Sequence, residues 1–138
     1  MELEMKLKDR VAIVTAGAGA GIGQTTARML AAEGARVIVA DIHEERSDQT
    51  AQAIQDEYGV EAVGIRCDVT NLDDVKNIVD VAMKRFGRID ILLNNAGTNR
   101  PSRIVDMKDD AWHLVIDTSL TGTLNLCISD WRLVSTIH

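Results

Sequence analysis

Glycines at alternate positions, set between a short apolar run and a helical pattern, are the residues of this chain that most clearly suggest a chemical function. They are Gly17, Gly19, Gly21 and Gly23. A glycine backbone can turn sharply and approach a ligand closely, because no Cβ stands in the way. The helical pattern begins at Ile22, and the unpaired N–H groups of a first helical turn favour an anion. The stretch therefore predicts a pyrophosphate site between a strand and a helix.

A carboxylate about twenty residues beyond such glycines can bind the ribose of an adenosine through both of its hydroxyl groups. Asp41 holds that position, directly after a second apolar run. Its charge would repel a 2′-phosphate, so the sequence favours NAD(H) over NADP(H) as the cofactor. The alternative is that Asp41 only caps the helix that follows, since Asp also suits an N-cap.

Strand and helix patterns alternate along the chain, and they must position these residues. Apolar runs predict strands at residues 11–14, 36–40, 62–66 and 89–93. Helical patterns cover residues 22–33, 44–58, 72–86 and about 108–127 or beyond, and Gly34, Gly59 and Gly87 end the first three. Residues 1–138 are therefore expected to form a single α/β domain, a doubly wound parallel sheet with helices on both faces.

The composition argues against several other classes of function. A net charge of -6 with no basic stripe is unfavourable for a nucleic-acid or anionic membrane surface. The first ten residues are too charged for a signal peptide, and no apolar run reaches membrane-spanning length. Cys67 and Cys127 have no metal or redox spacing, and the histidines have no metal or triad spacing. We therefore expect a cytoplasmic protein with two buried thiols and no metal site.

Four motifs stand in a fixed order, and together they resemble the short-chain dehydrogenase/reductase family from Asp9 to Cys127. They are Gly21-Ile22-Gly23, Asp41, Cys67-Asp68-Val69 and Asn94-Asn95-Ala96-Gly97. The last motif, after the fourth predicted strand, is much more specific than the glycine turn. The resemblance implies a Rossmann-like fold and hydride transfer between a nicotinamide cofactor and an alcohol or carbonyl substrate.

The resemblance also implies roles for residues after the third and fourth strands. Asp68 would accept a hydrogen bond from the adenine amino group, and Val69 would lie along the adenine ring. Asp68 could instead cap the helix that starts near Leu72. Asn94 is expected to tie neighbouring strands together. The residues expected to bind the dinucleotide are Gly17, Gly19, Gly21, Ile22, Gly23, Asp41, Asp68 and Val69, with Asn95, Ala96 and Gly97 under the ribose on the nicotinamide side.

The sequence departs from the family pattern at three places. Ala16 stands between Thr15 and Gly17, so either Thr15 shifts or the loop bulges by one residue. Ser119 replaces an Asn that holds a water of the proton relay in the family. The family's catalytic Tyr-x-x-x-Lys pair is missing, since the one tyrosine is Tyr58 and the last lysine is Lys108.

These departures lead us to expect an NAD(H)-binding oxidoreductase polypeptide that is inactive alone, truncated after the fourth strand and the following helix. One alternative is a non-catalytic NAD-binding or interaction module that pairs with full-length relatives, and another is a relic without activity. The final helix belongs to the dimer interface by resemblance, and the fourth strand would expose an apolar edge. We therefore expect self-association or pairing through these two features.

Overall fold

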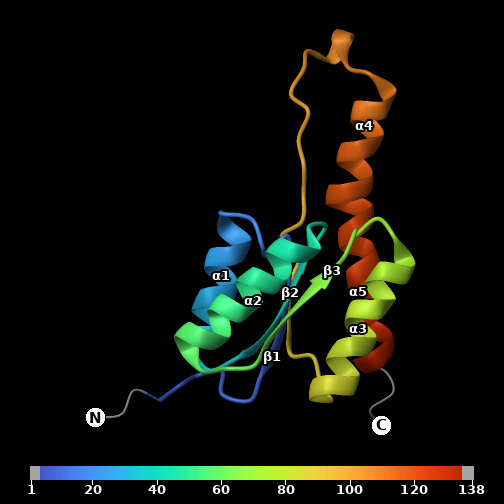
Figure 1. Ribbon diagram of the computed structural model, residues 1–138. Helices are drawn as coiled ribbons and strands as arrows, with labels where there is room; N and C mark the ends of the chain where they lie inside the picture. The colour runs from blue at the N-terminus through green and yellow to red at the C-terminus, as the bar shows by residue number, and fades with distance from the viewer. Residues whose placement is uncertain (1–3, 135–138) are drawn as a thin grey trace.

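Four short runs of small and β-branched apolar residues form one parallel sheet in the order β3-β2-β1-β4. The strands are β1 (Val11–Thr15), β2 (Arg36–Asp41), β3 (Ala62–Arg66) and β4 (Ile91–Leu93). The computed structural model describes residues 4–134 (Figure 1). The topology confirms the predicted Rossmann-like parallel sheet.

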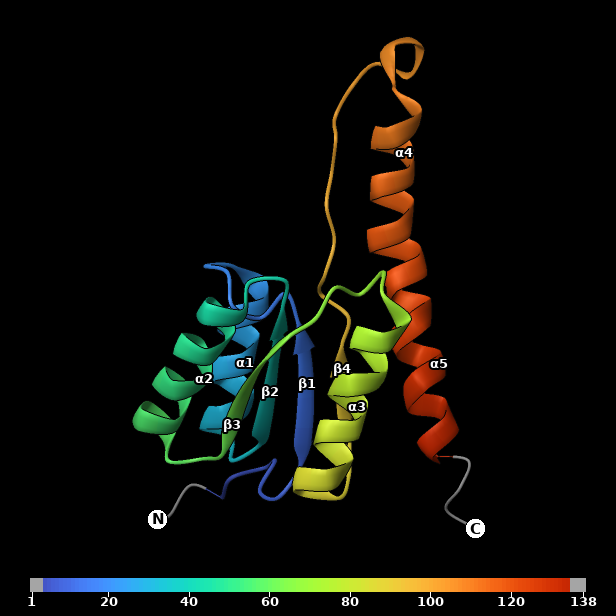
Figure 2. The ribbon, with the colours of Figure 1, turned by 45° about the vertical axis from the view of Figure 1, so that its right-hand side comes forward.

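Helices cover both faces of this sheet, which confirms the doubly wound arrangement. The helices α1 (Ile22–Ala32) and α2 (Glu44–Tyr58) lie on one face (Figure 2). On the other face lie α3 (Leu72–Phe86) and α5 (Gly122–Val134). Side chains alternate between the faces: Ile13 joins the core under α3 and α5, and its neighbour Val14 joins the core under α1 and α2.

Helix α3 shows how local sequence sets the bounds of an element. The Asn71 side chain accepts hydrogen bonds from the backbone N–H groups of Asp73 and Asp74, at 2.9 and 3.1 Å. Gly87 ends the helix with φ 74°, in the left-handed region that favours glycine. The predicted bounds of this helix, of α2 and of β3 are all confirmed.

The fourth strand is shorter than predicted, because residues 89 and 90 do not belong to it. Asp90 makes two hydrogen bonds to the backbone of Val11. The Asp90 backbone N–H donates to the Val11 carbonyl at 2.9 Å. The Asp90 carboxylate accepts the Val11 N–H, also at 2.9 Å. At the start of β1 the Asp90 side chain thus accepts a hydrogen bond that a paired strand would accept through its backbone. Elsewhere the predictions were wrong by one residue, because β1 includes Thr15, β2 includes Asp41 and α1 ends at Ala32.

The final helical pattern consists of three consecutive segments, not of one regular helix over 108–127. These are α4 (Asp109–Ile116), a π-helical segment (Asp117–Thr121) and α5. Ile116 and Gly122 keep right-handed helical φ and ψ, so the segments form one continuous rod that rises above the sheet (Figure 2). A short 3-10 turn, Ile104–Asp106, lies at the top of the loop that leads into it.

Within residues 4–134, β4 pairs with β1 alone and no strand lies on its other side. The same part of the chain contains no helix long and apolar enough to cross a membrane.

Candidate functional site

A cavity of about 450 Å³ lies at the carboxyl edge of the sheet, beside the rod that carries α4. Five of the predicted binding residues line it: Asp41, Asp68, Val69, Ala96 and Gly97. Asn95 lies outside this cavity and lines a shallower hollow with Gly97 and Ser119. The structure thus brings together residues from the ends of β2, β3 and β4, as the topology requires.

The glycine-rich loop absorbs its extra residue at Ala16, which has φ 51°. Thr15 pairs with Ala40 of β2 as the last residue of β1, so Ala16 lies in the loop and not in the strand. The Thr15 hydroxyl accepts the N–H groups of Asn95 and Ala96, each at 3.0 Å, and donates to the Leu93 carbonyl at 3.2 Å. Thr15, and not Asn94, therefore ties β1 to β4.

The N-terminus of α1 faces this loop without a side-chain cap. Among residues 4–134 no acceptor binds the backbone N–H groups of Ile22, Gly23 and Gln24, whereas Thr25 N–H reaches Gly21. A Cβ at Gly23 would overlap the Ala16 carbonyl and lie 2.5 Å from the Asn95 amide nitrogen, so only glycine fits there. A Cβ at Gly19 or Gly21 would meet nothing within 4 Å, so the outer side of the loop is open.

Asp41 is buried at the end of β2, with 7% of its surface exposed. One carboxylate oxygen accepts the Ala18 N–H at 3.2 Å, and the other accepts the His43 N–H at 3.1 Å. Since His43 is the N-cap of α2, the helix-cap alternative for Asp41 is wrong. Each oxygen keeps a further lone pair for a ligand in the cavity.

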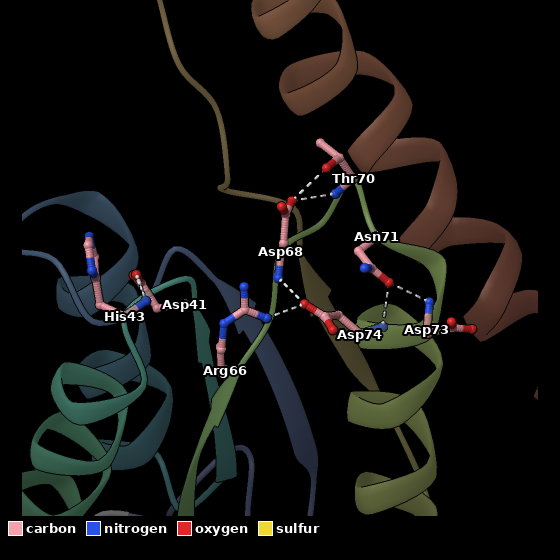
Figure 3. Close-up of polar contacts among 8 residues, drawn as sticks. All are labelled: Asp41, His43, Arg66, Asp68, Thr70, Asn71, Asp73 and Asp74. Carbon is pink, nitrogen blue, oxygen red and sulfur yellow. Dashed lines mark hydrogen bonds and ion pairs between the residues drawn. The ribbon is translucent and has the colours of Figure 1, made fainter.

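Asp68 follows β3, at the same carboxyl edge of the sheet as Asp41, and its carboxylate points toward Thr70 (Figure 3). One oxygen of Asp68 accepts both the backbone N–H and the hydroxyl of Thr70, at 2.9 and 2.7 Å. The Asp68 N–H donates to Asp74, which also binds Arg66 at 2.7 Å. The cap of α3 is Asn71, so the helix-cap alternative for Asp68 is wrong as well.

Val69 is held between the cavity and α5. Its carbonyl accepts a hydrogen bond from the Asn125 side chain at 3.0 Å. Its side chain fills the space beside Gly122, where a Cβ would lie only 2.5 Å from Val69 Cγ2. The rod is thus part of the cavity's support.

The two cysteines differ, which corrects the expectation of two buried thiols. Burial, reinforced by the negative charges of Asp74 and Asp68 and opposed by Arg66, raises the pKa of Cys67 to about 12. That thiol stays protonated and apolar, as expected. Cys127 is exposed on α5, and its sulfur accepts a hydrogen bond from the Asn94 side chain at 3.5 Å. Asn94 was predicted to tie neighbouring strands, but its side chain binds a helix.

Other residues of the cavity were not predicted, and most come from segments that follow the specific motifs. They are Ala16, Ile42, His43, Thr70, Thr98, Arg100, Leu114 and Thr118, with Cys67. Leu114 and Thr118 are four residues apart and share one face of the rod. That spacing was visible in the sequence, but the docking of the rod against the sheet was not.

In the described part of the chain, no group of three or more His, Cys, Asp or Glu side chains could hold a metal ion.

Comparison with known proteins assigns the family. The family model described as short chain dehydrogenase matches residues 10–132. A "(5R,7aS)-5-hydroxy-7a-methyl-1-oxo-2,3,5,6,7,7a-hexahydro-1H-indene-carboxyl-CoA reductase" of Mycobacterium tuberculosis is 44% identical over 117 residues, which are 84% of this chain and 44% of that protein. The 3-oxoacyl-[acyl-carrier-protein] reductase FabG of Thermotoga maritima is 37% identical over 122 residues, 88% of this chain and 49% of that protein.

Solved structures agree with these matches. A short chain dehydrogenase from Mycobacterium smegmatis superposes with a TM-score of 0.92 at 35% identity, over 99% of this chain and 56% of that one. L-sorbose reductase from Gluconobacter frateurii, solved with NADPH and L-sorbose, gives 0.87 at 26% identity, over 94% of this chain and 49% of that one. The chain spans about half the length of the curated relatives that it matches. It belongs to the short-chain dehydrogenase family.

Proposed function

We propose that this chain binds NAD(H) across the carboxyl edge of its sheet and forms the cofactor-binding half of an alcohol–carbonyl oxidoreductase. The observation that carries the proposal is the buried Asp41 carboxylate, which lines the cavity beside an uncapped helix N-terminus. The Asp41 carboxylate can accept hydrogen bonds from ribose hydroxyl groups, and the uncapped N-terminus of α1 can bind a pyrophosphate.

We assign the cavity to the adenosine half of the cofactor. In this proposal Asp41 accepts the ribose hydroxyls, Asp68 accepts the adenine amino group, and Val69 lies along the ring. The pyrophosphate crosses the open side of Gly19 and Gly21 to the free N–H groups at Ile22 and Gly23. Asn95, Ala96 and Gly97 then lie under the second ribose.

We propose NAD(H) and not NADP(H), because a buried carboxylate at the ribose repels a 2′-phosphate. The structural neighbour solved with NADPH indicates that this architecture also suits the phosphorylated cofactor. The choice in this chain therefore depends on Asp41.

We propose further that residues 1–138 bind the cofactor without turning it over. The reaction of the family is hydride transfer, and it needs a proton donor beside the substrate. Tyr58 packs on α2 against the core under α1 and α2 and does not line the cavity. No Tyr-x-x-x-Lys pair occurs in the sequence.

A non-catalytic module that pairs with a second polypeptide is the other candidate, favoured by the surface of the rod. Trp112, Leu120, Leu124 and Ile128 are all exposed there, and β4 has a free edge within the described residues. We propose that these features mediate self-association or pairing.

The two free thiols fit a reducing compartment, so we propose that the protein is located in the cytoplasm.

The test is a titration of the purified chain with NADH and NADPH, followed by cofactor fluorescence. We expect NADH to bind more tightly than NADPH, and Asp41→Ala to weaken NADH binding by about tenfold or more, since hydrogen bonds to a charged group contribute about 1.5–3 kcal/mol. The exposed Asp110→Ala is the matched control and should change nothing. Absence of NADH binding at millimolar concentration would contradict the proposal.

Two further measurements test catalysis and association. Hydride transfer with a panel of secondary alcohols and NAD should be undetectable, and turnover that Asp41→Ala abolishes would refute inactivity. In gel filtration the apparent mass should rise with concentration, whereas a stable monomer at every concentration would exclude self-association.

A further inference from the structure

The lengthened glycine-rich loop is held by side chains from three different elements. The Ala16 carbonyl accepts a hydrogen bond from Asn95, after β4, at 3.4 Å. The Ala18 N–H donates to Asp41 of β2. The Ala18 carbonyl accepts a hydrogen bond from Gln24 of α1 at 3.3 Å. All three hydrogen bonds hold Ala16 or Ala18, within the part of the loop that contains the extra residue.

Gln24 is the member of this set that no motif includes. Its side-chain nitrogen carries two protons, and both have acceptors: the Ala18 carbonyl and the Thr50 hydroxyl on α2, the latter at 3.2 Å. Thr50 is itself buried, and α1 and α2 lie side by side (Figure 1). Gln24 therefore fixes the loop to the helix layer.

Ala18 is buried, with 5% of its surface exposed, so its polar groups depend on protein partners. Asp41 satisfies its N–H, and Gln24 satisfies its carbonyl. A buried carbonyl without a donor is costly, and the peptide would rotate to find one. Because Ala16 is in the left-handed region, which alanine rarely adopts, the neighbouring peptides need such external ties.

We propose that Gln24 is a positioning residue, which orders the glycine-rich loop for the pyrophosphate of the cofactor through the Ala18 carbonyl. The inference rests on the proposed dinucleotide binding. Gln24 does not touch the ligand in this account; it compensates for the freedom that the extra residue introduces.

The decisive comparison is Gln24→Leu against Gln52→Leu. Both changes remove a helix-surface amide donor of the same size, but Gln52 is exposed and binds only Asp56, one turn along α2. Gln24→Leu should weaken NADH and ADP by about threefold to tenfold, the range of one neutral hydrogen bond, and leave adenosine, which lacks a pyrophosphate, within about twofold. Gln52→Leu should change none of these affinities.

Amide hydrogen exchange, read by NMR without any ligand, gives an independent measurement. Exchange at Ala18 should accelerate in Gln24→Leu and remain unchanged in Gln52→Leu, with circular dichroism confirming that both fold. In this ligand-free measurement Gln24→Glu, which keeps the size but cannot donate, should accelerate exchange as Gln24→Leu does. If the parent chain binds no NADH, the proposed function fails, and the exchange data still decide the ordering of the loop. Unchanged exchange, or an equal loss of ADP and adenosine affinity, would overturn the role of Gln24.

Discussion

The contact between Gly122 and Val69 couples the rod to the cavity wall, and replacing Gly122 by alanine tests that coupling. Gly122 is the first residue of α5, and its backbone continues the helix from the π-helical segment. Val69 is almost fully buried, with 6% of its surface exposed, and its carbonyl is bound by Asn125. Neither Gly122 nor Val69 can therefore move away easily to make room for a methyl group.

The size of the effect follows from the geometry. The new methyl carbon would lie 2.5 Å from Val69 Cγ2 and 3.0 Å from Val69 Cβ. Non-bonded carbons prefer about 3.5–4.0 Å, so the shorter contact overlaps by about 1 Å or more. Overpacking of this kind costs about 1–3 kcal/mol. Alanine also gains about 1 kcal/mol over glycine within a helix, so the single variant alone mixes two opposed effects.

A double-mutant cycle with Val69→Ala separates these effects. Val69→Ala alone should lower the free energy of unfolding by about 1–3 kcal/mol, because two buried methyl groups are lost. In that background the 2.5 Å overlap with Cγ2 is removed and only the 3.0 Å approach to the Cβ of residue 69 is left, so most of the steric cost disappears and the helical gain remains. The double variant should therefore be more stable than additivity predicts by about 1–3 kcal/mol.

Urea unfolding of the four proteins, followed by circular dichroism, measures this coupling, and NADH titration should show weaker binding by Gly122→Ala. Strict additivity within about 0.5 kcal/mol, with Gly122→Ala more stable than the parent, would refute the reasoning. It would mean that α5 does not press on the cavity wall.

Three other substitutions test the cap, the acid limb and the alkaline limb of stability. Asn71→Ala removes the acceptor for two helix N–H groups, so the free energy of unfolding should fall by about 1 kcal/mol and the Tm by roughly 3–6 °C; an unchanged melting curve would contradict the cap. Burial opposes ionisation of Asp90, but hydrogen bonds from Arg88, the Val11 N–H and Arg10 outweigh it and hold its pKa below the ordinary 3.8. Its stabilising contribution is present above pH 3.8 and lost as the pH falls, so Asp90→Asn should flatten the acid limb of a urea-midpoint profile, and an unaltered slope would count against this. Burial raises the pKa of Cys67 from 9.0 to about 12, so its contribution is complete below pH 9.0 and lost as the pH rises towards 12. Cys67→Ala should remove that alkaline loss, and in the parent chain a thiol reagent at neutral pH should modify the exposed Cys127 and spare Cys67.

The local sequence was sufficient to predict the bounds of a helix or strand where residues at its own ends determine where it begins and stops. Helix α3 begins at the cap of Asn71 and ends at Gly87, and both signals act within one turn. The fourth strand was overestimated because Asp90 binds Val11, a contact between segments far apart in the chain. Such pairings are invisible to a local pattern.

The same distinction applies to the site. The ends of parallel strands meet at one edge, so Asp41, Asp68 and Gly97 could be grouped from their positions alone. Ala16 was recognised as an extra residue, but its left-handed backbone and the contact of its carbonyl with Asn95, 79 residues away in the chain, could not be read from a local pattern. Leu114 and Thr118 enter the cavity only because α5 docks on Val69, which no local pattern specifies.

Asp41 combines two functions that substitution of Asp41 alone cannot separate, because its carboxylate both lines the cavity and holds the Ala18 N–H. Gln24 shares only the second function, through the Ala18 carbonyl. Gln24→Leu should therefore weaken NADH and NADPH equally and leave their affinity ratio unchanged, whereas Asp41→Ala should reduce that ratio. Since both side chains hold the same residue, Ala18, through its two adjoining peptide groups, their effects on ADP affinity should be less than additive. A ratio that shifts in Gln24→Leu would mean that loop order, and not the charge of Asp41, selects between the two cofactors.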